Sequence, residues 1–110
     1  MHCHVRDPET TQPSMNIEFY REVTEGIRDS GIDVILNLTT GPGARFSPTK
    51  NDPSIASDDS KMCTPSERVS HVLELRPEIC SLDIVTMNRK SHVFLNHPEH
   101  LKYMSAEIQS

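Results

Sequence analysis

Apolar residues along the first half of the chain change their spacing several times, and each spacing predicts a different element. In residues 1–7 apolar and polar side chains alternate, which is the period of a strand. In residues 16–30 apolar side chains recur every four positions, which predicts a helix with Asn16 as N-cap and Gly31 as a left-handed stop. Residues 33–38 contain three consecutive apolar side chains, as in a strand covered on both faces.

The second half of the chain repeats this alternation. The segment Thr64–Glu67 predicts a helix start, because Thr64 can cap, a proline suits the first helical position and the glutamate completes a capping box. This helix ends at Arg76–Pro77, and the mostly apolar residues 79–87 predict another strand. A last helix begins near Pro98, with Asn96 and Glu99 marking its start.

The order of elements, strand–helix repeated three times, predicts an α/β fold with a parallel sheet. Residues 44–63 are polar with few apolar anchors, and we expect them to form a long loop. Two full strands and three helices are too few to cover both faces of a parallel sheet. We therefore expect residues 1–110 to be a fragment of a single, larger α/β domain, most simply a barrel, whose first strand is cut near Met1.

Composition narrows the function classes. The chain has 110 residues, of which 35% are hydrophobic and 5% aromatic, which is lean for an independent core. The net charge is −5 and the basic residues are scattered, so the footprint of a nucleic-acid-binding protein is missing. The sequence has no membrane-spanning apolar run and no signal-peptide pattern. Three widely spaced cysteines argue against a disulfide framework, and we expect a cytoplasmic protein.

The opening sequence MHCHVRD contains the first candidate site. In a strand, His2 and His4 lie on one face about 6.6–6.8 Å apart along the chain, so both imidazoles could bind one cation. Imidazole suits Zn, Fe, Ni or Cu. Cys3 points to the opposite face, and Asp7 is expected to cap the following turn rather than bind metal. Since catalytic zinc sites normally use three protein ligands, a chance pair of histidines stays open as the alternative.

Polar residues also follow the later strands. The segment Leu38–Gly43 (LTTGPG) lies where the carboxyl ends of parallel strands form binding sites, and it could bind a carboxylate or phosphate or be a simple turn. Ser81 and Thr86 belong to the next predicted strand, where each could point inward or pack as a core hydroxyl.

The remaining histidines are weaker candidates. His97 and His100 lie three apart at a helix start, a spacing that brings both to one side, but a solvent-exposed helix terminus explains them better. His71 and His92 are predicted to be surface residues.

Several ordered motifs together resemble one family. HCHVRDPETTQPSM resembles the H-x-H-x-R-D signature of the β-keto acid cleavage enzymes, whose founding member is the 3-keto-5-aminohexanoate cleavage enzyme of lysine fermentation. NLTTG, RPEICSLD and VFLNHPEHLKYM follow in the order of that family. The resemblance covers nearly the whole chain except residues 44–63.

This resemblance implies a (β/α)8 TIM barrel of more than twice this length, of which the chain would form roughly the end of strand 2 through helix 4. It implies that His2 and His4 are two zinc ligands, with a glutamate outside this chain as the third. Thr39 and Ser81 match positions that contact the substrate. Pro42 falls where the family has a glycine, and it has no N–H to donate. The family's catalytic arginine and aspartate lie on later strands.

The implied reaction converts a β-keto acid and acetyl-CoA into acetoacetate and a new acyl-CoA. The full-length enzyme is expected to be a homo-oligomer, and the scattered charge and the lack of a long apolar run predict no nucleic-acid or membrane partner. The truncated chain is expected to be inactive alone. Two alternatives stay open: a metal-dependent hydrolase of the amidohydrolase type, which also has an H-x-H at a strand end, and a non-catalytic fragment.

Overall fold

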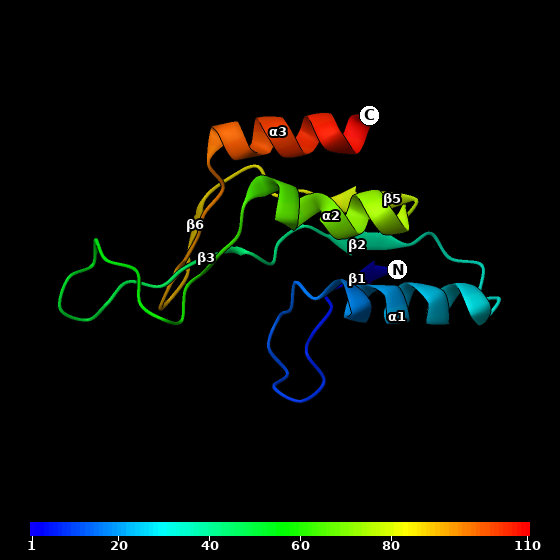
Figure 1. Cartoon of the computed structure of the whole chain (residues 1–110), viewed down its shortest axis with the longest axis horizontal. Helices are drawn as coiled ribbons and strands as arrows, with labels where there is room; N and C mark the ends of the chain where they lie inside the picture. Colours follow the sequence, from blue (N-terminus) through cyan, green and yellow to red (C-terminus); the bar gives the residue numbers. More distant parts are fainter.

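The computed structural model describes residues 1–110 as a flat, elongated mixed α/β molecule with extents of 51 × 34 × 19 Å (Figure 1). The elements in chain order are β1 (His2–Cys3), α1 (Ile17–Asp29), β2 (Asn37–Thr39), β3 (Ala44–Phe46), β4 (Lys61–Met62), α2 (Pro65–Leu75), β5 (Ile79–Ser81), β6 (Met87–Asn88), β7 (Val93–Phe94) and α3 (Pro98–Gln109). None of the helices is long and apolar enough to cross a lipid bilayer.

The first sheet is parallel, as the alternation of elements predicts. Its strand order is β1-β2-β5, with α1 connecting the first pair and α2 the second. In the register, Cys3 pairs with Leu38, and Leu38 with Cys80. The strands are shorter than the predicted segments 33–38 and 79–87, since only residues that pair with a neighbour form the ladder.

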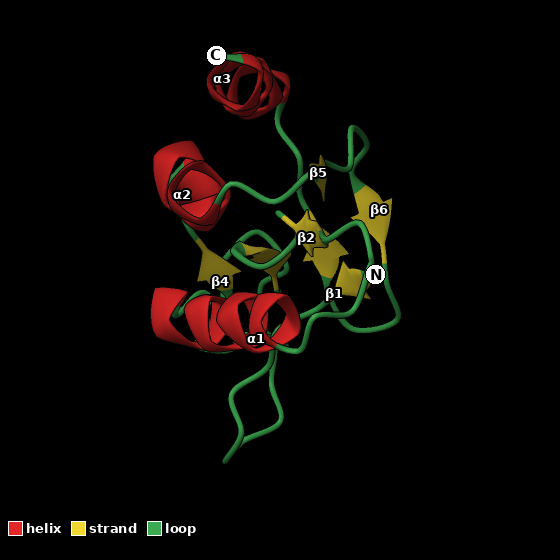
Figure 2. Cartoon of the chain, turned by 90° about the vertical axis from the view of Figure 1, so that its right-hand side faces the viewer, coloured by secondary structure: helices red, strands yellow, loops and turns green.

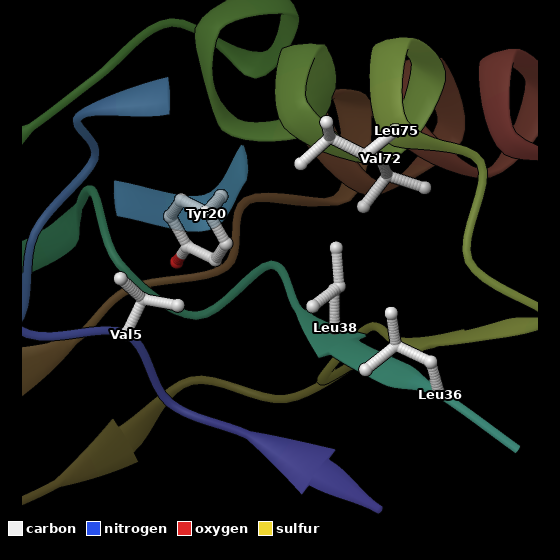
Figure 3. Packing of buried hydrophobic residues seen from close by; sticks show 6 residues of the cluster. All are labelled: Val5, Tyr20, Leu36, Leu38, Val72 and Leu75. Atoms are coloured by element: carbon white, nitrogen blue, oxygen red, sulfur yellow. The ribbon is translucent and has the colours of Figure 1, made fainter. Parts of the chain in front are cut away.

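One face of this sheet forms the core. Helices α1 and α2 lie on the same side of it (Figure 2). The cluster between them contains side chains from β2 and the residue before it, from both helices and from the segment after β1, which meet in the close-up view (Figure 3). Its members are Val5, Tyr20, Leu36, Leu38, Val72 and Leu75. Cys3 and Cys80 pack against it, which places Cys3 opposite the two histidines as predicted.

The opposite face of the sheet is open. Ile35 is 62% exposed and Ile79 is 53% exposed. The prediction that residues 33–38 are covered on both faces is therefore wrong within this chain. Exposed isoleucines on a parallel sheet are unusual, because parallel sheets are normally covered on both faces.

The second sheet is antiparallel, with strand order β4-β3-β7-β6, and lies beyond the carboxyl end of β2 (Figure 1). Residues 44–63, expected to be a loop, begin and end in two of its strands, with an additional bridge between Pro48 and Ala56. No local pattern predicts these strands, because the paired residues are few and partly charged. Arg45, for example, pairs with both Lys61 and Phe94.

The helix ends follow local sequence rules. Asn16 caps α1 by accepting a hydrogen bond from the Glu18 amide, and Gly31 has φ +70°, as predicted. At the start of α2, the Thr64 hydroxyl accepts from the Glu67 amide, and the Glu67 carboxylate accepts from the Thr64 amide, which confirms the capping box.

Helix α3 begins at Pro98 as predicted, but with a different cap. Asn96 was expected to mark its start, yet the cap is His97, whose Nδ1 accepts a hydrogen bond 3.2 Å long from the Glu99 amide. Asn96 is buried instead, and its side chain bonds to other segments of the chain.

Replacing Thr64 with alanine is expected to lower the free energy of unfolding by about 1 kcal/mol, since the amides of α2's first turn lose a capping partner. Urea denaturation of the variant measures this loss. The matched control is Ser70→Ala on the exposed side of the same helix, which should change stability much less. Equal losses in the two variants would contradict a capping role for Thr64.

Candidate metal centre at the strand ends

His2 and His4 lie together on the open face of the sheet. Both are exposed, while Cys3 and Val5 alternate with them toward the core. The Nε2 atoms of the two histidines are 2.8 Å apart, and their ring centroids are 4.6 Å apart with the rings at 82°. The i, i+2 spacing therefore brings two ring nitrogens to one point in space, as the sequence predicted.

This geometry fits two ligands of one metal ion. Two nitrogens bound tetrahedrally to zinc at about 2.0–2.1 Å each would be about 3.3 Å apart, so the pair would need to open by only about half an ångström. The chain contains no group of three histidine, cysteine, aspartate or glutamate side chains that could hold a metal. A metal ion bound by the two imidazoles would therefore need a further protein ligand from outside this group of residues.

Asp7 is not that further ligand. Its Oδ1 accepts hydrogen bonds from the amides of Thr10 and Glu9, at 3.1 and 2.8 Å. These bonds hold the pKa of Asp7 below its ordinary value, and the bond from the Thr10 amide has the largest effect. The carboxylate therefore caps the turn after β1, as expected from the sequence.

Two hydroxyl side chains share the open face with the histidines. In the ladder Thr39 of β2 pairs with Ser81 of β5, two residues beyond the level at which His2 pairs with Asn37. The Ser81 hydroxyl donates to Asn37 Oδ1 at 3.1 Å, and the Thr39 hydroxyl accepts from the Gly41 amide at 3.1 Å. Strand alternation therefore places the candidate substrate-binding residues Thr39 and Ser81 on the side of the sheet that carries the histidine pair, where Thr39 is only 3% exposed and Ser81 is half-buried.

Asn37 was not predicted from the sequence as a residue of the candidate site. Its position two residues before Thr39 on the same strand could have indicated it. A side chain at i−2 in a strand lies on the same face. Here it lies between His2 on one neighbouring strand and Ile79 on the other.

The turn after β2 leaves no room for larger residues. Gly43 has φ +89°, and a Cβ at this position would lie 3.0 Å from the Cys63 Sγ and 3.1 Å from the Arg68 Cγ. The Gly43 carbonyl accepts a hydrogen bond from the Cys63 amide at 2.8 Å. Pro42, between Gly41 and Gly43, has no N–H, so any backbone donor at this turn has to come from its neighbours.

Thr86 does not lie on the strand with Ser81, because β5 ends at Ser81. The Thr86 hydroxyl accepts from the Asn96 amide at 3.0 Å. It therefore joins the segment after β5 to the segment before α3.

His71 is buried, and the prediction that it is a surface residue is wrong. It is 1% exposed on the inner side of α2, and its ring packs on Tyr20 with centroids 4.1 Å apart. Its Nε2 lies 2.8 Å from the Thr39 carbonyl oxygen, so Nε2 carries the proton and donates. Burial lowers the pKa of His71, and the bond to Thr39 offsets this only in part.

The other histidines do not assemble a metal site. His97 uses Nδ1 to cap α3, and its ring centroid is 5.8 Å from that of His100. No carboxylate or thiol joins this pair to make three ligands. His92 lies half-buried on the turn between β6 and β7.

Stability is expected to fall as the pH drops below the ordinary histidine pKa of 6.5. The unfolded chain then binds a proton at residue 71 that the folded chain excludes. Between the pKa of His71 in the unfolded chain and its lower pKa in the folded chain, this lowers the free energy of unfolding by up to about 1.4 kcal/mol per pH unit. Above about pH 6.5 this contribution is fully present. Urea unfolding at several pH values measures the slope, which His71→Phe should flatten. An unchanged slope in that variant would contradict a buried, neutral His71.

Three parallel strands with helices between them, and a histidine pair beside two hydroxyls on one sheet face, define a candidate metal-dependent α/β enzyme. A sequence model of the family described as beta-keto acid cleavage enzyme matches residues 1–110. The chain belongs to this family. Membership favours the β-keto acid cleavage interpretation over an amidohydrolase-type hydrolase.

Two curated relatives are similar along most of the chain. The chain is 43% identical over 112 residues to a 3-dehydrocarnitine:acetyl-CoA trimethylamine transferase of Rhizobium meliloti, covering 98% of the chain and 37% of that protein. It is 27% identical over 103 residues to a 3,5-dioxohexanoate:acetyl-CoA acetone transferase of Paraburkholderia graminis, covering 94% of the chain and 27% of that protein. The chain thus spans well under half the length of both.

Proposed function

We propose that the protein is a zinc-dependent β-keto acid cleavage enzyme and that this chain supplies two of its zinc ligands and part of its substrate-binding wall. The observation that carries the proposal is the convergence of the His2 and His4 Nε2 atoms, on the sheet face shared with Thr39 and Ser81, in a member of this family.

The proposed fold is a (β/α)8 barrel, with the chain forming roughly the end of strand 2 through helix 4. Three neighbouring parallel strands in sequence order, with α1 and α2 on one side, support it. The exposed Ile35 and Ile79 lie on the face that a barrel would enclose. An apolar groove beside β1, lined by Phe19, Val23 and other side chains, is where a preceding barrel element would pack.

The proposed metal is zinc, held by His2, His4 and a glutamate outside this chain. Neutral imidazoles and a carboxylate are common ligands of catalytic zinc, and three protein ligands leave a position open for substrate. When bound, the zinc ion would act as a Lewis acid that polarises the keto oxygen of the substrate. The paired side chains already hold the two nitrogens close together, so little rearrangement is needed to bind the ion.

The chain's own residues would bind and orient the keto acid. The hydroxyls of Thr39 and Ser81 lie on adjacent strands at one level of the ladder and are suited to hydrogen-bond a carboxylate or keto oxygen. Asn37 accepts from Ser81 and so fixes the direction of that hydroxyl. At Pro42 no amide is available, and we propose that Gly41 or Gly43 supplies the backbone donor at this turn.

The proposed reaction moves a two-carbon unit between acyl groups. The bond between C2 and C3 of the β-keto acid breaks, and the CH2–COO⁻ unit forms a new bond to the acetyl carbonyl carbon of acetyl-CoA. The acetyl C–S bond breaks in turn, and the CoA thiolate forms a new thioester bond with the former C3 carbonyl carbon. The products are acetoacetate and a CoA thioester of the remaining acyl group. Relatives named as transferases that act with acetyl-CoA support this choice of co-substrate.

Product analysis tests the function. The full-length protein is incubated with a β-keto acid, beginning with 3-dehydrocarnitine, and acetyl-CoA labelled in its acetyl group. We expect label in acetoacetate and an unlabelled acyl-CoA, both lost after chelation and restored by zinc. Acetoacetate without label, or turnover that is independent of acetyl-CoA, would contradict the proposal.

Residues 1–110 alone are proposed to bind zinc weakly and to be inactive. Two imidazoles with solvent make a poor zinc site compared with three protein ligands. Titration of the isolated chain with zinc tests this, and tight stoichiometric binding would contradict it.

A further inference from the structure

Two buried polar side chains on α2 face the carboxyl end of β2. Arg68 and His71 are each 1% exposed, and their i, i+3 spacing places them on the same side of the helix. The rest of this buried face consists of Val69, Val72 and Leu75, which pack as an ordinary apolar stripe. The two polar residues thus interrupt a face that apolar side chains could fill.

Both side chains donate to consecutive backbone carbonyls. His71 Nε2 donates to the Thr39 carbonyl at 2.8 Å. Arg68 donates to the Thr40 carbonyl twice, from Nη2 at 3.1 Å and from Nε at 3.3 Å. The backbone at the end of β2 is therefore held from the α2 side at two adjacent peptide groups.

The same residues are held from the opposite side by β5. The amide and the hydroxyl of Thr40 both donate to the Ser81 carbonyl, at 3.0 and 2.8 Å. Arg68 Nη2 also donates to Asn96 Oδ1 at 3.0 Å, and Asn96 Nδ2 donates to the Val85 carbonyl. One guanidinium thus connects the turn after β2 with the segment that follows β5.

Packing alone does not account for this arrangement. Arg68 forms no ion pair with a carboxylate, and its Nη1 has no hydrogen-bond partner. Burial lowers the pKa of Arg68, which shows that its environment disfavours the charge. A protein with an apolar side chain of similar size at such a position is often at least as stable. The buried donors therefore indicate that these two residues serve to fix the backbone of Thr39 and Thr40.

We propose that Arg68 and His71 are positioning residues that lock the Thr39–Thr40 backbone, so that the Thr39 hydroxyl is held on the open face beside the histidine pair. The proposal rests on the function proposed above only in taking Thr39 as a substrate contact. Neither residue touches the open face, so each acts through the strand that it holds. Loss of either bond should loosen substrate binding and leave zinc in place.

The test compares variants of the full-length protein that remove or keep the donors. Arg68→Met and His71→Leu remove them, His71→Gln keeps an N–H donor, and Ser70→Ala on the exposed side of α2 is the control. Amide hydrogen exchange at Thr40 and Gly41, zinc content, and the KM and kcat for the β-keto acid are measured.

In Arg68→Met and His71→Leu we expect faster exchange at both amides and a KM raised about tenfold, with kcat changed less and zinc content unchanged. His71→Gln should restore most of the wild-type exchange and KM. If the truncated side chains prevent folding, Arg68→Lys serves instead, because one ammonium cannot reproduce the guanidinium's separate bonds to Thr40 and Asn96.

Unchanged exchange at Thr40 and Gly41 in the folded variants would overturn the proposal, as would His71→Gln behaving like His71→Leu. Failure of the proposed function is distinguishable, because the wild-type protein would then turn over no β-keto acid. The exchange measurements would still show whether Arg68 and His71 hold the backbone.

Discussion

Replacing His4 with alanine is expected to abolish stoichiometric zinc binding and keto acid cleavage together in the full-length protein. One of two converging Nε2 atoms is lost, and the remaining imidazole and an external glutamate would make only a two-ligand site. We expect zinc affinity to fall by at least about a hundredfold, since even losing an outer-shell partner of a metal ligand costs about 10–100-fold. Metal analysis after dialysis, beside the turnover assay, measures both effects.

The matched control for His4→Ala is His97→Asn. Asparagine at position 97 keeps an acceptor for the Glu99 amide and so preserves the cap of α3, while the imidazole is removed. We expect zinc content and activity to stay at the wild-type level in this control. Zinc retained in His4→Ala but lost in His97→Asn would assign the metal to the second histidine pair and contradict the account.

Replacing Leu38 with alanine is expected to lower the free energy of unfolding by about 2–5 kcal/mol, the range for removing a buried leucine side chain. Leu38 has no exposed surface and lies in the middle of the core cluster, opposite α1 and α2 (Figure 3). The cavity left by the truncated side chain lies on the strand that carries Thr39. We therefore expect the lower stability of Leu38→Ala to reduce activity as well, at temperatures near the melting temperature.

Ile55→Ala is the control for this stability prediction. Ile55 is 55% exposed in the segment between β3 and β4, so its truncation removes little buried surface. Urea denaturation of the two variants compares them directly. Similar losses in both would show that the cluster around Leu38 is not the main core.

Local sequence rules were sufficient to predict the three helices and the N-caps of two of them, α1 and α2. Asn16 and Thr64 act through amides two or three residues away, so the sequence contains both partners of each bond. The prediction for α3 identified its start, but placed the cap one residue early, because both Asn96 and His97 carry a suitable acceptor. Only the tertiary bonds of Asn96 to Arg68 and Val85 decide between them.

Non-local features were harder to predict. The extent of each strand depends on which residues a neighbour pairs with, so the observed strands are Asn37–Thr39 and Ile79–Ser81 rather than the predicted segments 33–38 and 79–87. The second sheet pairs residues 44–46 with residues 93–94, and no local sequence pattern predicts this pairing. His71 was missed because a polar residue on a helix is normally read as exposed, whereas its partners are a strand carbonyl and a tyrosine from α1.

Of the candidate site, the sequence predicted the parts that depend on strand alternation alone. The i, i+2 spacing placed His2 and His4 on one face, with Cys3 on the other, and the structure has this arrangement. Thr39 and Ser81 were matched by resemblance and lie side by side in the ladder. Their roles toward substrate, and that of Pro42, stay predictions.

Anomalous diffraction at the zinc edge, from crystals of the full-length protein, is the direct test of zinc binding by His2 and His4. We expect one strong peak about 2.0–2.1 Å from the Nε2 atoms of both His2 and His4, with a glutamate oxygen as the third protein ligand. No peak beside the two histidines in the zinc-loaded protein, or a peak at His97 and His100 instead, would contradict it.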